Sequence, residues 1–268
     1  MIIDFHTHSF PDSLAPKAMA SLAITFSSIA AIKPQTDGTA GGAKKILSDA
    51  GISKAVVCNI ATNARQETKV NDYAISLLAD GFFYPFGSVH PDSEKIESEL
   101  DRLKSAGIKG IKLHPDYVKI PLNDPRYNRI FEALTDRQML VVVHAGFDPI
   151  SPDKIHATAE MFRGVIEKYP DLKIVAAHMG GYAKAKDVYE NLVGTGIYFD
   201  TSLSSMREDE KEILYKILRE HDENKILFGT DTPWSVAKAE IEFIKNAPIS
   251  EEYKEKIFYK NALALLKD

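Results

Sequence analysis

The chain has 268 residues, of which 44% are hydrophobic and 26% charged, an ordinary globular composition with enough chain for one large core. Its net charge of −5 comes from acidic and basic residues mixed along the chain, without a basic stripe, so we expect no nucleic-acid partner. The single cysteine, Cys58, excludes a disulfide framework within the chain and favours a reducing, cytoplasmic location, with Cys58 itself a small buried apolar residue.

No segment suggests insertion into a membrane. The N-terminus has no basic region followed by an apolar one, and the longest uncharged stretch, residues 18–32, contains three serines and a threonine. We therefore expect neither a signal peptide nor a membrane span.

Apolar segments of strand length alternate with helix-like segments along the whole chain. We predict eight strands, at residues 2–6, 55–60, 82–89, 108–114, 139–144, 173–178, 197–201 and 226–230. Several are nearly continuous in valine, isoleucine, alanine and leucine, as expected of parallel strands buried on both faces. We predict helices at residues 65–80, 92–106, 126–137, 153–169, 183–192, 208–221, 236–246 and 251–267.

This alternation predicts one α/β domain over residues 1–268, folded as a (β/α)8 TIM barrel. An open doubly wound sheet is the alternative, but no glycine-rich dinucleotide fingerprint follows an early strand. The connection at residues 9–39 is unusually long and is a candidate lid. We expect its apolar part, residues 22–32, to form a helix that covers the barrel mouth or makes a homodimer contact; extra packing on the rim is the alternative.

Six of the eight histidines fall at the ends of predicted strands, and these are His6, His8, His90, His114, His144 and His178. Alternate residues of a strand share a face, so Asp4, His6 and His8 point the same way. The carboxyl ends of barrel strands meet at one mouth, and Asp231 follows the eighth strand, which neighbours the first in a closed barrel. Histidines and an aspartate around one open position are typical of a catalytic metal site.

Five segments occur in order at these strand ends: Asp-Phe-His-Thr-His at 4–8, Gly-Ile-Lys-Leu-His-Pro at 110–115, His144, His-Met-Gly-Gly at 178–181 and Gly-Thr-Asp-Thr-Pro-Trp at 229–234. Together they resemble the amidohydrolase superfamily, and most closely its amidohydrolase 2 group. That group includes metal-dependent hydrolases and lyases similar to aminocarboxymuconate-semialdehyde decarboxylase. The resemblance implies a distorted TIM barrel that holds a divalent metal ion at its mouth.

The resemblance also implies roles for individual residues. His6, His8, His144 and Asp231 would be metal ligands, and Asp231 would shuttle a proton. His178 would be a second-metal ligand or a catalytic acid or base. Zinc is the first expectation for such ligands, and manganese or iron would fit them too.

Lys112 has two interpretations. In the binuclear branches of the superfamily a lysine of the fourth strand is carboxylated and bridges two metal ions. An unmodified Lys112 would instead pair with Asp231 or hold an anionic substrate. We favour the unmodified lysine and a single ion, because the decarboxylase-like relatives are mononuclear.

The leading hypothesis for function is hydrolysis of a small carboxylate-bearing or cyclic substrate. A bound metal lowers the pKa of its water from 15.7 to about 7, which supplies hydroxide at neutral pH. Asp231 would accept the proton, while the metal, His178 or Lys112 would stabilise the oxyanion.

The alternative is a metal-dependent, non-oxidative decarboxylase of an aromatic or unsaturated acid, with Arg65, Lys112 and Arg207 as cations for the leaving carboxylate. A barrel that has lost its chemistry and serves as a scaffold is the third hypothesis. We expect the pocket wall to include Trp234, Phe147 and Tyr117, and we expect His90 and His114 to orient ligands or substrate.

Overall fold

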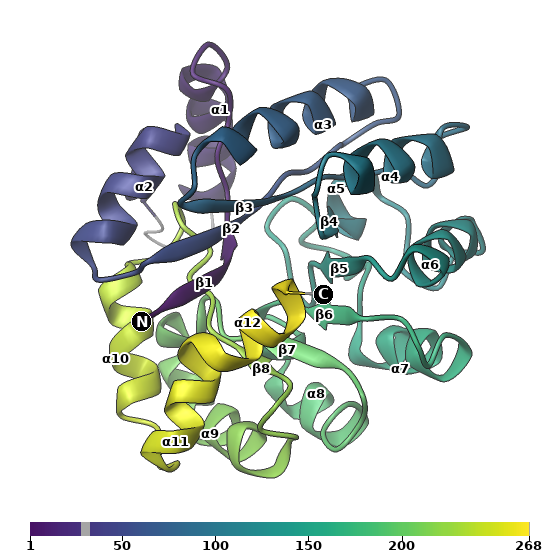
Figure 1. The fold of residues 1–268 in the computed structure, drawn as a ribbon. Coiled ribbons are helices and arrows are strands. Elements are labelled where there is room, and N and C mark those ends of the chain that lie inside the picture. Colours follow the sequence, from purple (N-terminus) through teal and green to yellow (C-terminus); the bar gives the residue numbers. More distant parts are fainter. Residues whose placement is uncertain (28–32, 268) are drawn as a thin grey trace.

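The computed structural model describes residues 1–27 and 33–267, and its strands follow one another in sequence order around a central axis (Figure 1). The strands are β1 Ile3–Thr7, β2 Lys54–Cys58, β3 Phe83–Phe86, β4 Gly110–Leu113, β5 Leu140–Val143, β6 Ile174–Ala176, β7 Tyr198–Asp200 and β8 Ile226–Leu227. All eight predicted strands are present, each shorter than predicted or shifted by a residue or two. Every pair is parallel.

The strands pair in two groups, β1-β2-β3 and β4-β5-β6-β7-β8. Isolated parallel bridges cross both seams, joining Gly87 to Ile111 and Thr7 to Thr232. The second seam is also crossed by the amide of Phe5, which donates to the Phe228 carbonyl at 2.7 Å. The arrangement is a distorted (β/α)8 barrel, as predicted, and β1 and β8 are neighbours.

Helices surround the strands (Figure 1). They are α1 Ala15–Ser27, α2 Ala40–Asp49, α3 Glu67–Ser76, α4 Ile96–Ser105, α5 Pro115–Val118, α6 Arg126–Arg137, α7 Ala159–Lys168, α8 Ala185–Asn191, α9 Lys211–Glu220, α10 Ala237–Lys245, α11 Glu251–Glu255 and α12 Asn261–Leu266. A π-helical turn, Lys256–Lys260, joins α11 to α12, so the predicted helix 251–267 is interrupted. In the described part of the chain, no helix has the length and apolar character needed to cross a membrane.

The prediction of a helix at residues 153–169 is wrong for its first six residues. Helix α7 begins only at Ala159, because the extended Thr158 caps it by accepting a hydrogen bond from the Met161 amide at 3.3 Å. The segment before it forms turns, which begin where the Asp148 carboxylate accepts from the Ile150 amide at 2.7 Å. This longer loop reaches the barrel mouth.

The insertion after β1 differs from its prediction. Helix α1 starts at Ala15, earlier than the predicted residue 22, and the last part of the predicted helix, residues 28–32, lies outside the described residues. Helix α2 begins at Ala40, where the predicted insertion of residues 9–39 ends, although its residues were not among the predicted helices, since two glycines near its start weaken the helical signal. Thr39 compensates by capping α2, accepting from the Gly42 amide at 3.0 Å.

Successive strand residues face two different cores. Val56 and Val142 pack inside the barrel, whereas their neighbours Val57 and Val141 pack outward against the helices. Helix α12 crosses the barrel in Figure 1 and adds Leu265 to the inner cluster. This two-sided burial confirms the interpretation of the continuous apolar runs.

Candidate metal centre

Three predicted ligands meet where β1 and β8 end. The amide of Asp231 donates to the His6 carbonyl at 2.7 Å, which fixes the loop after β8 against β1. Asp231 Oδ1 lies 3.0 Å from His8 Nε2 and 3.5 Å from His6 Nε2. The three atoms lie within 4.8 Å of one another, so one ion can contact all three.

Hydrogen bonds on the far side of each ring fix which nitrogen faces this group. His8 Nδ1 lies 2.8 Å from the Cys58 carbonyl oxygen, which can only accept, so the Nδ1 hydrogen is donated there. His6 Nδ1 lies 2.9 Å from Asp200 Oδ2 and donates to it in the same way. Both Nε2 atoms therefore carry lone pairs, and burial holds the pKa of His6 well below its ordinary value.

These donors fit a metal ion. His8 Nε2 and Asp231 Oδ1 both carry lone pairs at a separation of 3.0 Å, where they repel each other unless a proton or a cation lies between them. Asp231 is buried, and this burial raises the pKa of its carboxyl. Two neutral imidazoles and a carboxylate are ligands that zinc, manganese and iron accept.

Asp4 does not join this group but holds it in place. Its carboxylate accepts from the Thr230 amide at 3.0 Å, from the Thr230 hydroxyl at 2.6 Å and from the His6 amide at 3.1 Å. It thereby ties the residue before Asp231 to the strand that carries His6. Complete burial raises the pKa of Asp4 to about 8.

Lys112 is buried at the floor of the site, with 1% of its surface exposed. Its Nζ lies 2.9 Å from His6 Nε2, and burial lowers the pKa of the amine. Among the residues that the structure describes, no carboxylate oxygen lies within 4.0 Å of Lys112 Nζ, the distance at which the two would form an ion pair. The ion pair with Asp231 that the sequence left open is therefore not formed.

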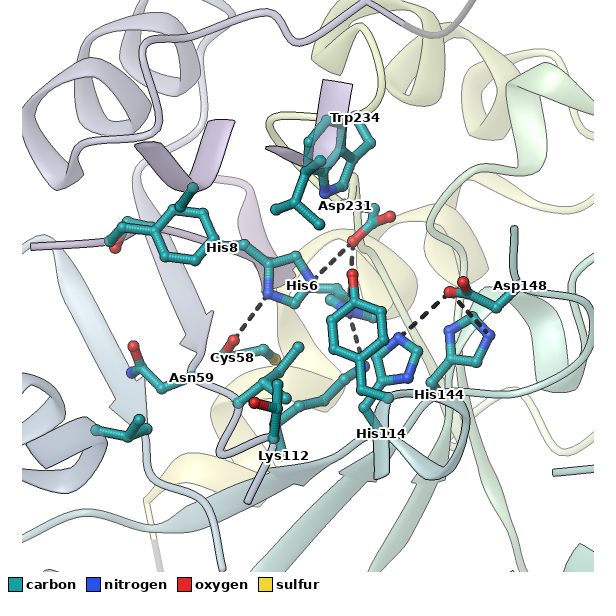
Figure 2. Close-up of a pocket in the computed structure, with 18 of the residues that line it drawn as sticks. His6, His8, Cys58, Asn59, Lys112, His114, His144, Asp148, Asp231 and Trp234 are labelled. Carbon is teal, nitrogen blue, oxygen red and sulfur yellow. Dashed lines mark hydrogen bonds and ion pairs between the residues drawn. The ribbon is translucent and has the colours of Figure 1, made fainter. Parts of the chain in front are cut away.

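The other two predicted ligands, His144 and His178, face each other. His144 Nδ1 lies 3.1 Å from His178 Nε2, and His178 Nδ1 lies 2.8 Å from the Ser202 hydroxyl oxygen. The structure does not bring His144 into the group of His6, His8 and Asp231. It places His144 in a second group of possible ligands with His114 and Asp148 (Figure 2).

A cavity of about 1150 Å³ opens above both groups. Helix α1 contributes Ala18, Ser21 and Leu22 to its wall, so the insertion covers part of the mouth. Three aromatic residues expected in the pocket also line it, and these are Tyr117, Phe147 and Trp234. His114 lines it as well, stacked between Tyr117 at 3.9 Å and His144 at 4.2 Å between ring centroids.

Two residues that we expected near the site, Arg65 and His90, lie outside the cavity wall. Arg65 is exposed and lies outside the cavity wall, whereas Arg207 lines it with its guanidinium 5.4 Å from the Tyr182 ring centre. His90 was predicted to end its strand, but β3 ends at Phe86 and His90 lies in the loop that follows, where its Nδ1 accepts from the amide of Asp92 and the side chain does not line the cavity.

Several site residues were missed in the sequence. Asp200 ends β7 as the histidines end their strands, so the same positional rule would have found it. The missed residues are Asp116, Asp148, His156, Asp200 and Ser202. Asp116 and His156 gave no signal, since their contact at 2.9 Å joins the short helix α5 to the loop before α7, far away in the chain.

The chain matches the family model described as amidohydrolase over residues 3–267. No curated protein matches it in sequence. Among solved structures, it is similar to an uncharacterized TIM-barrel protein from Bordetella bronchiseptica, with a TM-score of 0.77, 18% identity, and coverage of 100% of this chain and 99% of that one.

Two further similar structures are decarboxylases with manganese. One is 5-carboxyvanillate decarboxylase from Novosphingobium aromaticivorans, complexed with manganese and 4-hydroxy-3-methoxy-5-nitrobenzoic acid (TM-score 0.74, 18% identity, coverage 100% and 96%). The other is dihydroxybenzoic acid decarboxylase from Polaromonas, with manganese and the inhibitor 2-nitroresorcinol (TM-score 0.72, 16% identity, coverage 99% and 96%). At these identities the likeness shows a shared fold. The family match over nearly the whole sequence shows that the chain belongs to the amidohydrolase family.

Proposed function

We propose that the protein is a metal-dependent decarboxylase that removes carbon dioxide from an aromatic or unsaturated carboxylic acid. The sequence favoured a hydrolase first and a decarboxylase second. The two similar structures that are decarboxylases with bound manganese support the second hypothesis. His6, His8 and Asp231 would hold the ion, with manganese or zinc as the candidates, and ligation by His144 and His178 stays a prediction.

The observation that carries this proposal is the surroundings of Lys112. Lys112 is a buried lysine without a carboxylate partner among the described residues, and it lies beside the histidine–aspartate group, where a substrate carboxylate would favour the protonated amine. The nearby stack of Tyr117 and His114 offers a flat wall against which a planar acid can pack. A substrate carboxylate at Lys112 and a ring on this wall would complete the site.

The residues can then perform the reaction as follows. When bound, the metal ion would act as a Lewis acid that orients the substrate oxygens. Lys112 holds the substrate carboxylate, and the cavity wall excludes water. Asp231 is the acid that gives a proton to the carbon that bears the carboxylate.

The bond between that carbon and the carboxylate breaks as carbon dioxide leaves, and its electron pair restores the ring or double bond. The proton remains on the product carbon, and Asp231 recovers one from solvent. His178 is the second candidate acid or base, since its Nε2 carries the lone pair when Nδ1 donates to Ser202 at 2.8 Å.

The test incubates manganese- or zinc-loaded protein with hydroxybenzoic and unsaturated acids in D2O. The proposal expects carbon dioxide and a product with one deuterium at the vacated carbon, both abolished by Asp231→Asn. Hydrolysis, the second candidate, follows from the general chemistry of such metal sites. It would instead place 18O from labelled water in the product of an ester, lactone or amide. Incorporation of labelled oxygen without release of carbon dioxide would contradict the decarboxylase proposal. If the protein converts neither the acids nor the ester, lactone or amide, that result supports the scaffold hypothesis.

A further inference from the structure

We propose that Asn59 determines specificity in the cavity, because its side-chain oxygen accepts a hydrogen bond from a hydroxyl or amino group that the substrate carries apart from its carboxylate. The inference rests on the proposed function in one respect, since it takes the substrate to be a planar acid held at Lys112. It adds the chemical class of that acid, which is one with a second, hydrogen-donating substituent.

Asn59 follows β2, and its side-chain nitrogen joins the ends of two strands. Nδ2 donates to the Phe86 carbonyl at 2.8 Å and to the Val57 carbonyl at 3.4 Å. Both carbonyl oxygens can only accept, so the NH2 group must be the end of the amide that faces them. The other end is thereby fixed as well, and Oδ1 is an acceptor directed away from these two carbonyls.

Asn59 Oδ1 has no hydrogen-bond partner among the residues that the structure describes. The residue is 5% exposed and lines the cavity, so the little surface that it exposes faces the cavity contents. Figure 2 shows Asn59 on the side of the cavity away from His114 and His144. A ligand that fills this side displaces water from Oδ1, and the oxygen then stays unpaired unless the ligand donates to it.

Other polar groups of the same wall already have protein partners. The Thr62 hydroxyl donates to Gln66 Oε1 at 2.8 Å. The hydroxyl oxygens of Ser9 and Tyr73 lie 2.9 Å apart and share a hydrogen bond. All four residues line the cavity, but these oxygens are occupied in a way that Asn59 Oδ1 is not.

The chain on either side of Asn59 is apolar. Cys58 and Ile60 line the cavity next to it, and an apolar environment both strengthens a hydrogen bond and raises the cost of leaving an acceptor unpaired. A substrate hydroxyl would satisfy Oδ1, whereas a carboxylate or ether oxygen at the same place has no hydrogen to donate and would repel it. The wall therefore selects a donating substituent, such as the hydroxyl of a hydroxy acid.

The test measures the Kd values of zinc-loaded protein for matched ligands by titration calorimetry. The ligands are 3- and 4-hydroxybenzenesulfonate and the corresponding fluoro compounds, which are similar in size but cannot donate. The sulfonate keeps the negative charge of the acid and cannot leave as carbon dioxide. We expect the wild type to bind at least one hydroxy compound about 5- to 100-fold more tightly than its fluoro counterpart.

The variant Asn59→Leu should reduce this preference to about twofold or less, because leucine offers no acceptor. The matched control is Gln66→Leu, which removes an amide of the same wall whose oxygen already accepts from Thr62, and it should keep the preference of the wild type. Circular dichroism checks that the variants fold, and Asn59→Ala replaces Asn59→Leu if the latter does not.

Equal binding of both compounds by the wild type, or binding of neither, would overturn the proposal. If Asn59 served only to join the two strands, its substitution would weaken both ligands alike and leave their ratio unchanged, which would overturn the proposal too. A preference that depends on Asn59, without decarboxylation of hydroxybenzoic acids, would leave this inference standing and remove the proposed reaction. Decarboxylation without the preference would do the opposite.

Discussion

The substitution Asp200→Asn tests how the metal ligands are oriented. Asp200 Oδ2 accepts the hydrogen of His6 Nδ1 at 2.9 Å, and its Oδ1 accepts from the amides of His178 and Ser202, each at 3.1 Å. Asparagine has nearly the same shape, and its oxygen can keep the bonds to the two amides. Its NH2 group then faces His6 Nδ1, which must become an acceptor, so the ring hydrogen moves to Nε2.

That shift removes the lone pair that we assign to the metal. A hydrogen bond to a charged group contributes about 1.5–3 kcal/mol, and loss of a partner behind a metal-binding histidine weakens binding by about 10–100-fold. We therefore expect the Kd for zinc or manganese to rise by about 10–100-fold, equivalent to about 1.4–2.7 kcal/mol.

The assay is competition for the ion with a chromophoric chelator at fixed pH, with Asp171→Asn as the control. Asp171 is exposed, so its variant should bind metal like the wild type. Circular dichroism establishes that Asp200→Asn is folded. A Kd for Asp200→Asn within about twofold of the control would refute the orientation of His6 by Asp200.

Other predictions concern stability. Burial raises the pKa of Glu240 to about 8, so between about pH 4.5 and pH 8 this carboxyl ionises only in the unfolded chain. The free energy of unfolding should therefore fall by at most about 1.4 kcal/mol per pH unit over this range. Urea unfolding at pH 5 and pH 8 should show a smaller fall for Glu240→Gln than for the wild type. Gly146→Ala should lower the free energy of unfolding by at least about 2 kcal/mol, since φ is +86° and the new Cβ would lie 2.3 Å from the Tyr182 nitrogen. Gly164→Ala, on α7 with nothing near the new Cβ, should raise it by about 0.5–1 kcal/mol. Equal effects of the two substitutions in urea unfolding would contradict this reasoning. Metal removal should lower Tm by about 5–10 °C, and zinc or manganese at about 100 times Kd should restore it; an unchanged Tm in calorimetry would contradict metal binding to the native state.

The barrel could be predicted because its pattern is repeated. Each strand is a short apolar run buried on both faces, and a polar residue such as His144 or His178 follows its C-terminal end. The exceptions depend on local capping. Thr158 delays α7 and Thr39 starts α2, and neither threonine is distinguishable in sequence from one on a loop.

The site could be predicted only in part. The positions of His6, His8 and Asp231 follow from strand order alone, since β1 and β8 adjoin. The separation of His144 from this group could not be predicted, because it depends on the direction of loop carboxylates such as Asp148, which the sequence does not determine. The homodimer, the cytoplasmic location and the single-domain boundary stay predictions.

The central claim is that His6, His8 and Asp231 hold a metal ion, and the most direct measurement is a crystal structure of manganese-loaded protein with data at the manganese absorption edge. We predict an anomalous peak within about 2.0–2.3 Å of His6 Nε2, His8 Nε2 and an Asp231 oxygen. An ordered site at saturating manganese without a peak between these three residues would contradict it.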